Sequence, residues 1–234
     1  MRILALDTSG TNLSVCVIEE DKVIADFNLC AGMTHSETLL PVIDEILTKS
    51  KIDINDIDIL ACGIGPGSFT GLRIGIATIK GLALSLEKKV IGVPTLLGLA
   101  YNIPYFDGMI CSMIDAKNNN VYAGIYEYQQ NKLVQVGKYY TDSIDELITS
   151  LKAEEKNIIF VGDGVYAYQE KLRENIGERA KFASFPFNRE HAVSIAYEAL
   201  KRASRNEYDN VDTLNPMYLK KSQAERALET DGNL

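Results

Sequence analysis

The residues with the clearest potential for chemistry form a glycine-rich stretch, GIGPGSFTGLRIGIATIKG, at residues 63–81. A glycine-rich loop that opens a helix can bind phosphate, because its backbone N–H groups point at the anion. The stretch contains no Gly-Lys pair, so the Walker pattern is not met, and Thr70 stands where the dinucleotide pattern requires its third glycine. A weak phosphate site and a packing role for the glycines therefore both stay open.

Two aspartates could serve a nucleotide. Asp7 ends the apolar run 2–7, and Asp115 closes the apolar run 108–116. Such carboxylates can bind magnesium or a magnesium-bound water beside a phosphate, yet aspartate also commonly caps tight turns. The segment 161–168, VGDGVYAY, is the one candidate for an adenosine-binding shelf, although Asp163 interrupts its two glycines. A weak nucleotide site would therefore comprise Asp7, Thr8, Ser9, Asp115, Gly162 and Gly164.

The chain offers little for metal or thiol chemistry. It contains two histidines, His35 and His191, and four widely separated cysteines without a C-x-x-C pair. Zinc sites need clustered Cys or His ligands, and a catalytic triad needs a histidine at an informative spacing. The sequence therefore predicts buried reduced thiols, no metal site and no catalytic residue.

The overall charge limits the partners. The chain has 24 Lys and Arg against 32 Asp and Glu, a formal net charge of -8, whereas nucleic-acid binding needs clustered basic side chains. We therefore expect no direct contact with nucleic acid. No apolar run approaches the roughly 20 residues of a membrane span, and the N-terminus turns polar too early for a signal peptide. The expectation is a cytoplasmic protein without membrane contact.

The elements that must position these residues occur in an order that repeats once. Apolar alternation and helical periodicity predict three strands, a helix, a strand and a helix, and this order returns near residue 105. The predicted strands are 2–7, 13–18, 22–29, 58–65, 89–93, 108–116, 121–128, 132–140 and 158–162, and the predicted helices are 34–50, 68–88, 94–102, 143–152 and 191–203. We expect an α/β chain of two duplicated lobes, 1–104 and 105–234, with mixed sheets flanked by helices. Two such lobes facing a cleft are the arrangement of the actin-like (ASKHA, ribonuclease H-like) ATPases.

The predicted helix 68–88 carries its glycines on one face. Gly71 and Gly75 are four residues apart, and Thr78 and Leu82 continue that face. Each interior glycine costs about 0.5–1 kcal/mol relative to alanine, and close approach of another backbone would offset that cost. The approaching backbone is either the chain's own sheet or a helix of another protein, and the spacing alone favours neither.

Segments spread over nearly the whole chain resemble one family. They are MRILALDTSGTNLSVCVI, HSETLLPVIDEIL, GIGPGSFTGLRIGIATIKGLA, VIGVPTLLGLA, MIDAKNNNVYAGIY and PMYLKKSQAE. Together they are similar to the TsaB family, also called YeaZ, the dimerisation subunit of the bacterial tRNA threonylcarbamoyladenosine transferase complex. The resemblance implies the ASKHA fold and a non-catalytic scaffold without direct tRNA contact. Such a scaffold would dimerise with the catalytic subunit TsaD and recruit the ATPase TsaE, for threonylcarbamoylation of the adenosine next to the anticodon in tRNAs that read ANN codons.

The same resemblance implies the site residues. TsaD holds a metal with two histidines four residues apart, and the matching positions here are Thr95 and Leu99, which implies a pseudo-enzyme without that metal. The glycine face and the 34–50 helix become the interface with TsaD, or with a second copy of the chain when TsaD is missing. The implied partner-binding residues are Leu39, Ile43, Gly71, Leu72, Gly75, Ile76, Thr78, Ile79 and Leu82.

Several points stay open at this stage. The subunit is expected to require no cofactor, while ATP or ADP at the cleft or at the interface of the complex is left open. The docking of TsaE, the geometry of a homodimer, the role of Arg73 and the order of the tail after Tyr218 are open too. The alternative function is a free-standing ATPase or small-molecule kinase that uses Asp7 and Asp115. A glycoprotease activity would need a metal or a nucleophile, and the sequence indicates neither.

Overall fold

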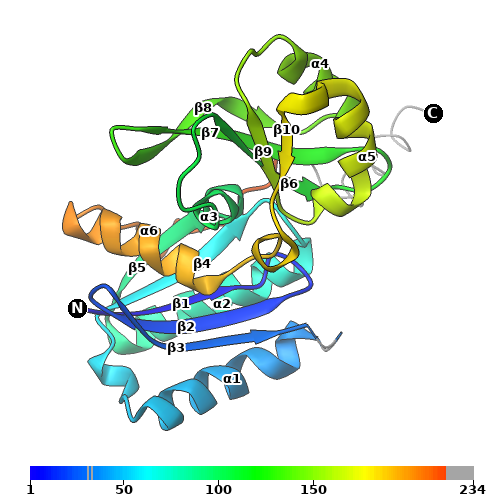
Figure 1. The fold of residues 1–234 in the computed structure, drawn as a ribbon. Helices are drawn as coiled ribbons and strands as arrows, with labels where there is room; N and C mark the ends of the chain where they lie inside the picture. Colours follow the sequence, from blue (N-terminus) through cyan, green and yellow to red (C-terminus); the bar gives the residue numbers. More distant parts are fainter. Residues whose placement is uncertain (31, 33, 220–234) are drawn as a thin grey trace.

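The computed structural model describes residues 1–30, 32 and 34–219. These residues form two five-stranded sheets, each with helices on its faces, and the two sheets lie one above the other in Figure 1. The α/β fold class and the two duplicated lobes predicted from the sequence are confirmed. The sequence leaves the order of the tail after Tyr218 open. Residues 220–234 of this tail lie outside the described part of the chain.

The first sheet has the strand order β3-β2-β1-β4-β5. Its strands are β1 (Arg2–Asp7), β2 (Leu13–Glu19), β3 (Lys22–Leu29), β4 (Ile59–Gly65) and β5 (Lys89–Pro94). The central strand β1 pairs antiparallel with β2 and parallel with β4, so Leu4 lies opposite Val17 on one side and Leu60 on the other. Helices α1 (His35–Ser50) and α2 (Phe69–Leu86) cover one face of this sheet, and α6 (Ala192–Ser204) covers the other.

The second sheet repeats the first, with the order β10-β9-β6-β7-β8. Its strands are β6 (Met109–Asp115), β7 (Val121–Gln129), β8 (Lys132–Tyr140), β9 (Ile158–Val161) and β10 (Ala180–Phe182). The central strand β6 pairs antiparallel with β7 and parallel with β9, with Cys111 opposite Ile125 and Phe160. Helices α4 (Ile144–Lys152) and α5 (Gly164–Ile176) cover one face, and α3 (Thr95–Tyr101) covers the other. The described residues also form three short 3-10 helices: η1 (Ile54–Asp56), η2 (Gly177–Arg179) and η3 (Phe185–Phe187).

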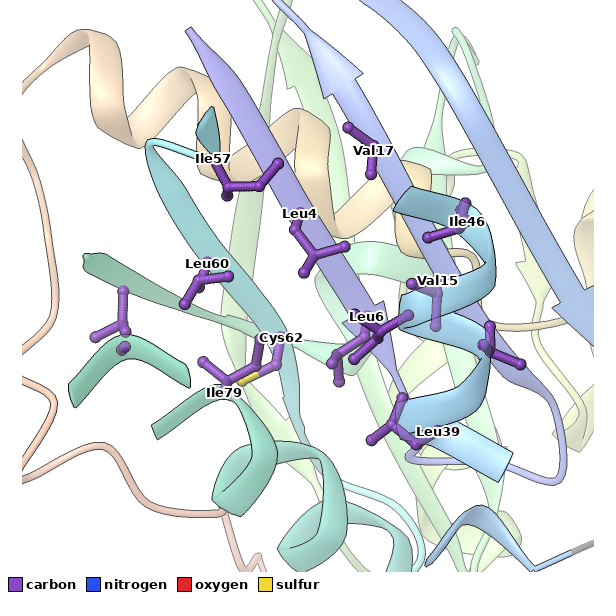
Figure 2. Packing of buried hydrophobic residues seen from close by; sticks show 14 of the residues in the cluster. Leu4, Leu6, Val15, Val17, Leu39, Ile46, Ile57, Leu60, Cys62 and Ile79 are labelled. Carbon is purple, nitrogen blue, oxygen red and sulfur yellow. The ribbon is translucent and has the colours of Figure 1, made fainter. Parts of the chain in front are cut away.

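The central strands are apolar along their whole length because helices cover both faces of each sheet. Figure 2 shows Leu4 and Leu6 of β1 on the side of the sheet that carries α1 and α2, among side chains that include Leu39 of α1 and Ile79 of α2. On the opposite face, Ala5 of β1 packs against α6. Full burial of each large apolar side chain contributes roughly 1.5–3 kcal/mol, which fixes the strand that ends in Asp7.

The last described part of the chain returns to the first sheet. Helix α6 packs on β1 and β2, and Asp209 accepts a hydrogen bond from the backbone N–H of Gly92 at 2.8 Å. The N–H of Met217 donates to the carbonyl of Ile64 at 2.7 Å. The repeat had assigned residues 105–234 to the second lobe, whereas the structure packs α6 and residues 205–219 against the first. This return places Glu190, just before α6, next to the β1–β2 turn, where Asn12 donates a hydrogen bond to its backbone carbonyl.

Two elements were not predicted, namely α5 and β10. Helix α5 buries only Val165, Leu172 and Ile176 besides its first glycine, so its apolar pattern is too sparse to read as a helical stripe. Strand β10 has three residues and joins the edge of the second sheet through parallel pairing with β9. Strand β10 lies at the edge of the second sheet. The start of α5 belongs to the expected nucleotide site, because it carries Gly164, and Tyr168 of α5 donates to Asp115.

Candidate functional site

Asp7 ends β1 at the cleft and is fully enclosed. Its Oδ1 accepts hydrogen bonds from the backbone N–H of Ser9 at 2.8 Å and from the Ser9 hydroxyl at 2.6 Å. Its Oδ2 is buried without a hydrogen-bond partner among the described residues. On the neighbouring strand, a Cβ on Gly63 would overlap Oδ2, so the glycine gives this oxygen its room. Burial raises the pKa of Asp7 more than the Ser9 hydrogen bonds lower it.

Glu190 is the second buried carboxyl group of the cleft. It lies two residues before α6 and is only 6% exposed. The carboxyl occupies the space where a Cβ on Gly10 would stand, and Asn12 donates a hydrogen bond to its backbone carbonyl at 2.7 Å. Burial, together with the negative charge of Asp7, raises the pKa of Glu190 to about 8. Two buried carboxyl groups with raised pKa values are therefore unlike two free carboxylates: at neutral pH the pair holds at least one proton.

Asp115, the equivalent residue of the second lobe, is in the opposite situation. Its Oδ1 accepts hydrogen bonds from the backbone N–H of Lys117 at 2.9 Å and from the Tyr168 hydroxyl at 3.3 Å. Its Oδ2 forms an ion pair with Lys117 Nζ at 2.7 Å. Partial burial raises the pKa of Asp115, but the Lys117 hydrogen bonds and charge together outweigh it and leave the pKa below its ordinary value. Asp115 therefore caps the β6–β7 turn as an ionised group.

The expected adenosine shelf is closed. A Cβ on Gly162, whose φ is +112°, would overlap the carbonyl of Met113, and Gly164 also lies against Met113. The N–H of Gly162 donates to Asn188 Oδ1 at 3.1 Å. The two glycines thus allow β6 to approach the start of α5, and the open surface that a purine ring would need is filled by the chain itself.

The glycine-rich loop performs the same task in the first lobe. At Gly71 an added Cβ would overlap the carbonyl of Thr8, and at Gly75 it would overlap the Thr8 hydroxyl. That hydroxyl donates to the carbonyl of Gly71 at 2.8 Å, and Ser68 N–H donates to the carbonyl of Ser9 at 2.6 Å. The prediction that Gly71 and Gly75 present a bare groove to another chain is therefore wrong, because the β1–β2 turn of this chain occupies it.

The loop does not present a free helix N-terminus either. Ser68 caps α2, since its hydroxyl oxygen accepts a hydrogen bond from the N–H of Gly71 at 3.2 Å. The carbonyl of Ser9 already occupies the N–H of Ser68. Two N–H groups that could bind a phosphate, those of Ser68 and Gly71, are therefore already hydrogen-bonded within the chain. The geometry supports the packing interpretation of the loop.

Most of the other expected partner-binding residues also lie inside the core. Five apolar side chains are buried among the first lobe's own residues: Leu39, Ile43, Leu72, Ile76 and Ile79. Ile76, which is 4% exposed, also lines a depression along α2. Thr78 and Leu82 remain partly exposed on α2. The residues selected from the sequence thus lie mainly on the side of α2 that faces the sheet.

The outward side of α2 has a different set of residues. Ala77, Gly81 and Leu84 are exposed at intervals of four and three residues, and Leu84 is 60% exposed. We call these three residues the outer α2 stripe. A Cβ on Gly81 would meet nothing within 4 Å, so this glycine, unlike Gly75, faces open space.

Arg73 anchors the end of the described chain to α2. Its guanidinium lies 3.9 Å from the ring centre of Phe69, and its Nε donates to the Tyr218 hydroxyl at 2.9 Å. The Phe69 and Tyr218 rings stack with their centres 4.8 Å apart. Beside them is a depression of about 530 Å³ along α2, lined also by Lys80 and Pro216. The role of Arg73 that the sequence left open is thus to hold residues near 218 against α2.

Comparison with known proteins was decisive for the family. A family model described as TsaD, tRNA N6-adenosine threonylcarbamoyltransferase, matches residues 30–228. The tRNA threonylcarbamoyladenosine biosynthesis protein TsaB of Bacillus subtilis (strain 168) is 29% identical over 225 residues, which are 96% of each chain. TsaB of Buchnera aphidicola subsp. Schizaphis graminum is 36% identical over 167 residues, covering 69% of this chain and 78% of that one. The chain belongs to the TsaB family.

Solved structures agree with membership of the TsaB family, also called YeaZ. YeaZ from Pseudomonas aeruginosa superposes with a TM-score of 0.79 at 26% identity, over 93% of this chain and 99% of that one. A ROK hexokinase from Thermus thermophilus superposes with a TM-score of 0.50 at 9% identity, over 86% of this chain and all of that one. The second likeness shows the fold alone, which is the ASKHA fold of the actin-like ATPases predicted from the sequence.

In this TsaB-family chain, Thr95 and Leu99 have structural roles. Thr95 Oγ1 accepts a hydrogen bond from the N–H of Gly65 at 3.2 Å. Leu99 is buried and lies beside Gly162. Within residues 1–30, 32 and 34–219, no group of three or more His, Cys, Asp and Glu side chains is arranged to hold a metal ion.

No local pattern in the sequence indicates Glu190, the second buried carboxyl group near Asp7. The two are 183 positions apart in the chain, and only the return of the chain to the first sheet brings them together. A glutamate just before an amphipathic helix is also an ordinary feature of helix starts. The single available hint was Gly10, a glycine next to a candidate phosphate turn, which here makes room for the Glu190 carboxyl group.

Proposed function

We propose that this chain is a non-catalytic scaffold of tRNA threonylcarbamoyladenosine biosynthesis that forms a heterodimer with TsaD and recruits TsaE. Membership of the TsaB family, whose relatives are named as tRNA threonylcarbamoyladenosine biosynthesis proteins, supports a role in that biosynthesis. The observation that carries the non-catalytic part is that both turns expected to bind phosphate are engaged within the chain. Ser9 bonds Asp7, Thr8 bonds the Gly71 carbonyl, and Asp115 is paired with Lys117.

The remaining features of the proposal follow from this internal engagement. A magnesium phosphate would have to displace the Lys117 ammonium group and draw the proton from the Asp7–Glu190 pair, so the scaffold needs no cofactor of its own. ATP or ADP would then act elsewhere in the complex. Because the chain has a formal net charge of -8, the tRNA phosphates would be bound by the partner subunits. The complex would act in the cytoplasm.

The proposed docking surface for TsaD is the outer α2 stripe, Ala77, Gly81 and Leu84, with partly exposed Thr78 and Leu82 beside it. Small residues four apart allow a second helix to approach closely, and an exposed leucine supplies apolar area to bury. Leu40 on the adjacent α1 is 57% exposed and extends the apolar surface. In the absence of TsaD, the same surface would pair with a second copy of the chain.

The docking surface is tested by mixing the chain with TsaD of the same organism and measuring the heterodimer by size exclusion and calorimetry. Gly81→Trp fills open space on α2, and Leu84→Asp places a charge on the stripe, so each should weaken the heterodimer by roughly 30-fold or more. Tyr166→Asp, at a 61% exposed position on α5, is the matched control and should bind like the unaltered chain. Unchanged affinity in both stripe variants, with unchanged melting temperatures, would refute this surface.

The non-catalytic role has a separate test. The isolated chain should show no ATP turnover above that of an Asp7→Asn variant, because Asp7 is buried and already bonded to Ser9. Turnover that disappears in Asp7→Asn would instead support the alternative ATPase or kinase. Recruitment of TsaE is measured by pull-down and should require the intact heterodimer.

A further inference from the structure

A second surface lies on the other side of the first lobe, away from α1 and α2. Here α6, α3, the segment after α3 and the β7–β8 hairpin enclose a depression of about 250 Å³. In Figure 1 the hairpin projects above α6 at this side of the molecule. Pro104, Asn131, Leu133 and Lys201 form part of its wall, and the other four lining residues are tyrosines: Tyr101, Tyr105, Tyr128 and Tyr197.

Two further depressions adjoin this one and share its tyrosines. A depression of about 70 Å³ shares Tyr197 and is lined by Ile18, Val23 and Leu200 among others. A depression of about 380 Å³ on the opposite side shares Tyr105 and Tyr128. The tyrosine rings are thus the ridges between three successive depressions, which we call the tyrosine groove.

The rings at the centre of the groove are held in place. The Tyr101 hydroxyl donates to Glu198 at 2.6 Å and accepts from Lys201 Nζ at 2.8 Å. The Tyr128 hydroxyl donates to the backbone carbonyl of Ile103 at 2.9 Å. A ligand therefore meets preorganised aromatic walls, and little side-chain freedom is lost on binding.

The two outer tyrosines are open to a ligand. Tyr105 is 65% exposed and Tyr197 is 50% exposed. Tyr105 packs on Tyr128 with ring centres 5.6 Å apart, and Tyr197 packs on Tyr101 at 5.1 Å. The Lys201 ammonium group also lies 5.4 Å from the centre of the Tyr197 ring. Within the described part of the chain, neither hydroxyl has a hydrogen-bond partner, so both can bond a ligand's carbonyl groups.

The charges along the groove select the sign of the ligand. Five carboxylates line the two outer depressions, and three lysines line the groove as a whole. Lys156 is paired with Glu127 at 2.8 Å, and Lys201 lies 3.9 Å from Glu198 and donates to the Tyr101 hydroxyl. The carboxylates are Glu20, Asp21, Asp107, Glu127 and Glu155. This surface repels a polyphosphate chain and attracts a cationic group, which a tyrosine face also favours.

We propose that the tyrosine groove binds an extended, proline-rich segment of a partner protein that carries an arginine at one end. Polyproline helices repeat every three residues, expose their carbonyl groups and dock in aromatic-lined depressions. The prolines lie between Tyr197 and the Tyr105–Tyr128 pair, whose rings are in contact. The arginine lies in the depression lined by Asp107 and Glu155, where Glu127 is paired with Lys156. An amphipathic helix fits less well, because it needs a continuous apolar trough and the largest depression is mostly polar.

The proposal is tested on the full chain with an array of Pro-x-x-Pro peptides that have arginine at either end. Each peptide is accompanied by an Arg→Glu and a Pro→Ala counterpart, and binding of retained peptides is measured by fluorescence anisotropy. Retention of arginine peptides over both counterparts is expected. Tyr197→Ala and Tyr105→Ala should each weaken binding by about tenfold, and Glu155→Lys should weaken only peptides that carry arginine.

The controls separate this surface from the proposed TsaD surface. Tyr166→Ala, another exposed tyrosine, and Leu84→Asp should leave peptide binding unchanged, and all variants should melt like the unaltered chain. No selective retention, equal binding of Arg→Glu peptides, or tighter binding of oligouridylate than of any peptide would each overturn the proposal. Such a result would leave the heterodimer with TsaD unaffected.

Discussion

The two lobes have the same strand order, and an aspartate ends the central strand of each, yet the two aspartates have opposite environments. Asp7 is buried, its Oδ2 has no hydrogen-bond partner among the described residues, and burial raises its pKa. Burial and the charge of Asp7 together raise the pKa of Glu190. Asp115 is paired with Lys117, and its pKa is lowered. The topology therefore fixes where a carboxyl group stands, while the residues that pack around it decide whether it holds a proton.

The lobes also share one packing device. In the first lobe, Gly71 and Gly75 admit the β1–β2 turn against α2, and in the second, Gly162 and Gly164 admit β6 against the start of α5. In both cases a glycine pair that looks suited to phosphate serves close backbone approach instead.

The largest effect is expected from Gly75→Leu. A side chain at this position overlaps the Thr8 hydroxyl and crowds Leu6, so the β1–β2 turn must leave α2. We expect a loss of about 4 kcal/mol or more, or failure to fold, in urea denaturation. Gly81→Leu on the same helix meets open space and should keep nearly all of the stability. Equal stability of the two variants would show that the turn does not depend on the glycine face.

The next effect concerns Glu190 and depends on pH. Its ordinary pKa is 4.5, and the folded chain raises it to about 8. The unfolded chain releases this proton above about pH 4.5 while the folded chain keeps it, so the free energy of unfolding should fall from there to about pH 8 and then level off.

Glu190→Gln removes this dependence. At pH 8 the free energy of unfolding of the variant should exceed that of the unaltered chain by on the order of a few kcal/mol. At pH 4.5 the two free energies should differ much less. Thermal denaturation over pH 4–9 measures both chains, and Glu178→Gln at an exposed position is the matched control. A constant difference between the two chains at every pH would mean that Glu190 keeps its ordinary pKa.

A smaller effect of opposite sign is expected at Asp115. Because its folded pKa is lowered, its contribution is present above the ordinary value of 3.8 and is lost as pH falls through the folded pKa. Lys117 is 79% exposed, so screening limits Lys117→Met to a loss of about 0.5–1 kcal/mol at neutral pH. The loss should shrink at pH 3. A loss that grows in acid would contradict the ion pair.

The residues that the sequence identified correctly, and those that it missed, differ in how local their information is. Strands β1 and β6 and their final aspartates follow from apolar runs in the sequence. The spacing of Gly71 and Gly75 correctly indicates a close approach. It contains no information about what approaches, which here is a turn 63 residues earlier in the chain.

The candidate site was less predictable than the fold for the same reason. Glu190 meets Asp7 only because α6 returns to the first sheet, and no local pattern in the sequence marks that return. The open face of Gly81 and the closed face of Gly75 differ by less than two helical turns on the same helix. Sequence periodicity defines faces relative to one another, and only the packed structure defines which face is outward.

The carboxyl groups can be observed directly by a carbon-13 NMR titration of the chain with labelled aspartate and glutamate side chains. The account predicts that Asp115 titrates below its ordinary value of 3.8, while the Asp7–Glu190 pair still holds a proton at pH 7. If Asp7 and Glu190 are both ionised at pH 7, burial does not raise their pKa values as described. The claimed difference in protonation between the two lobes would then be wrong.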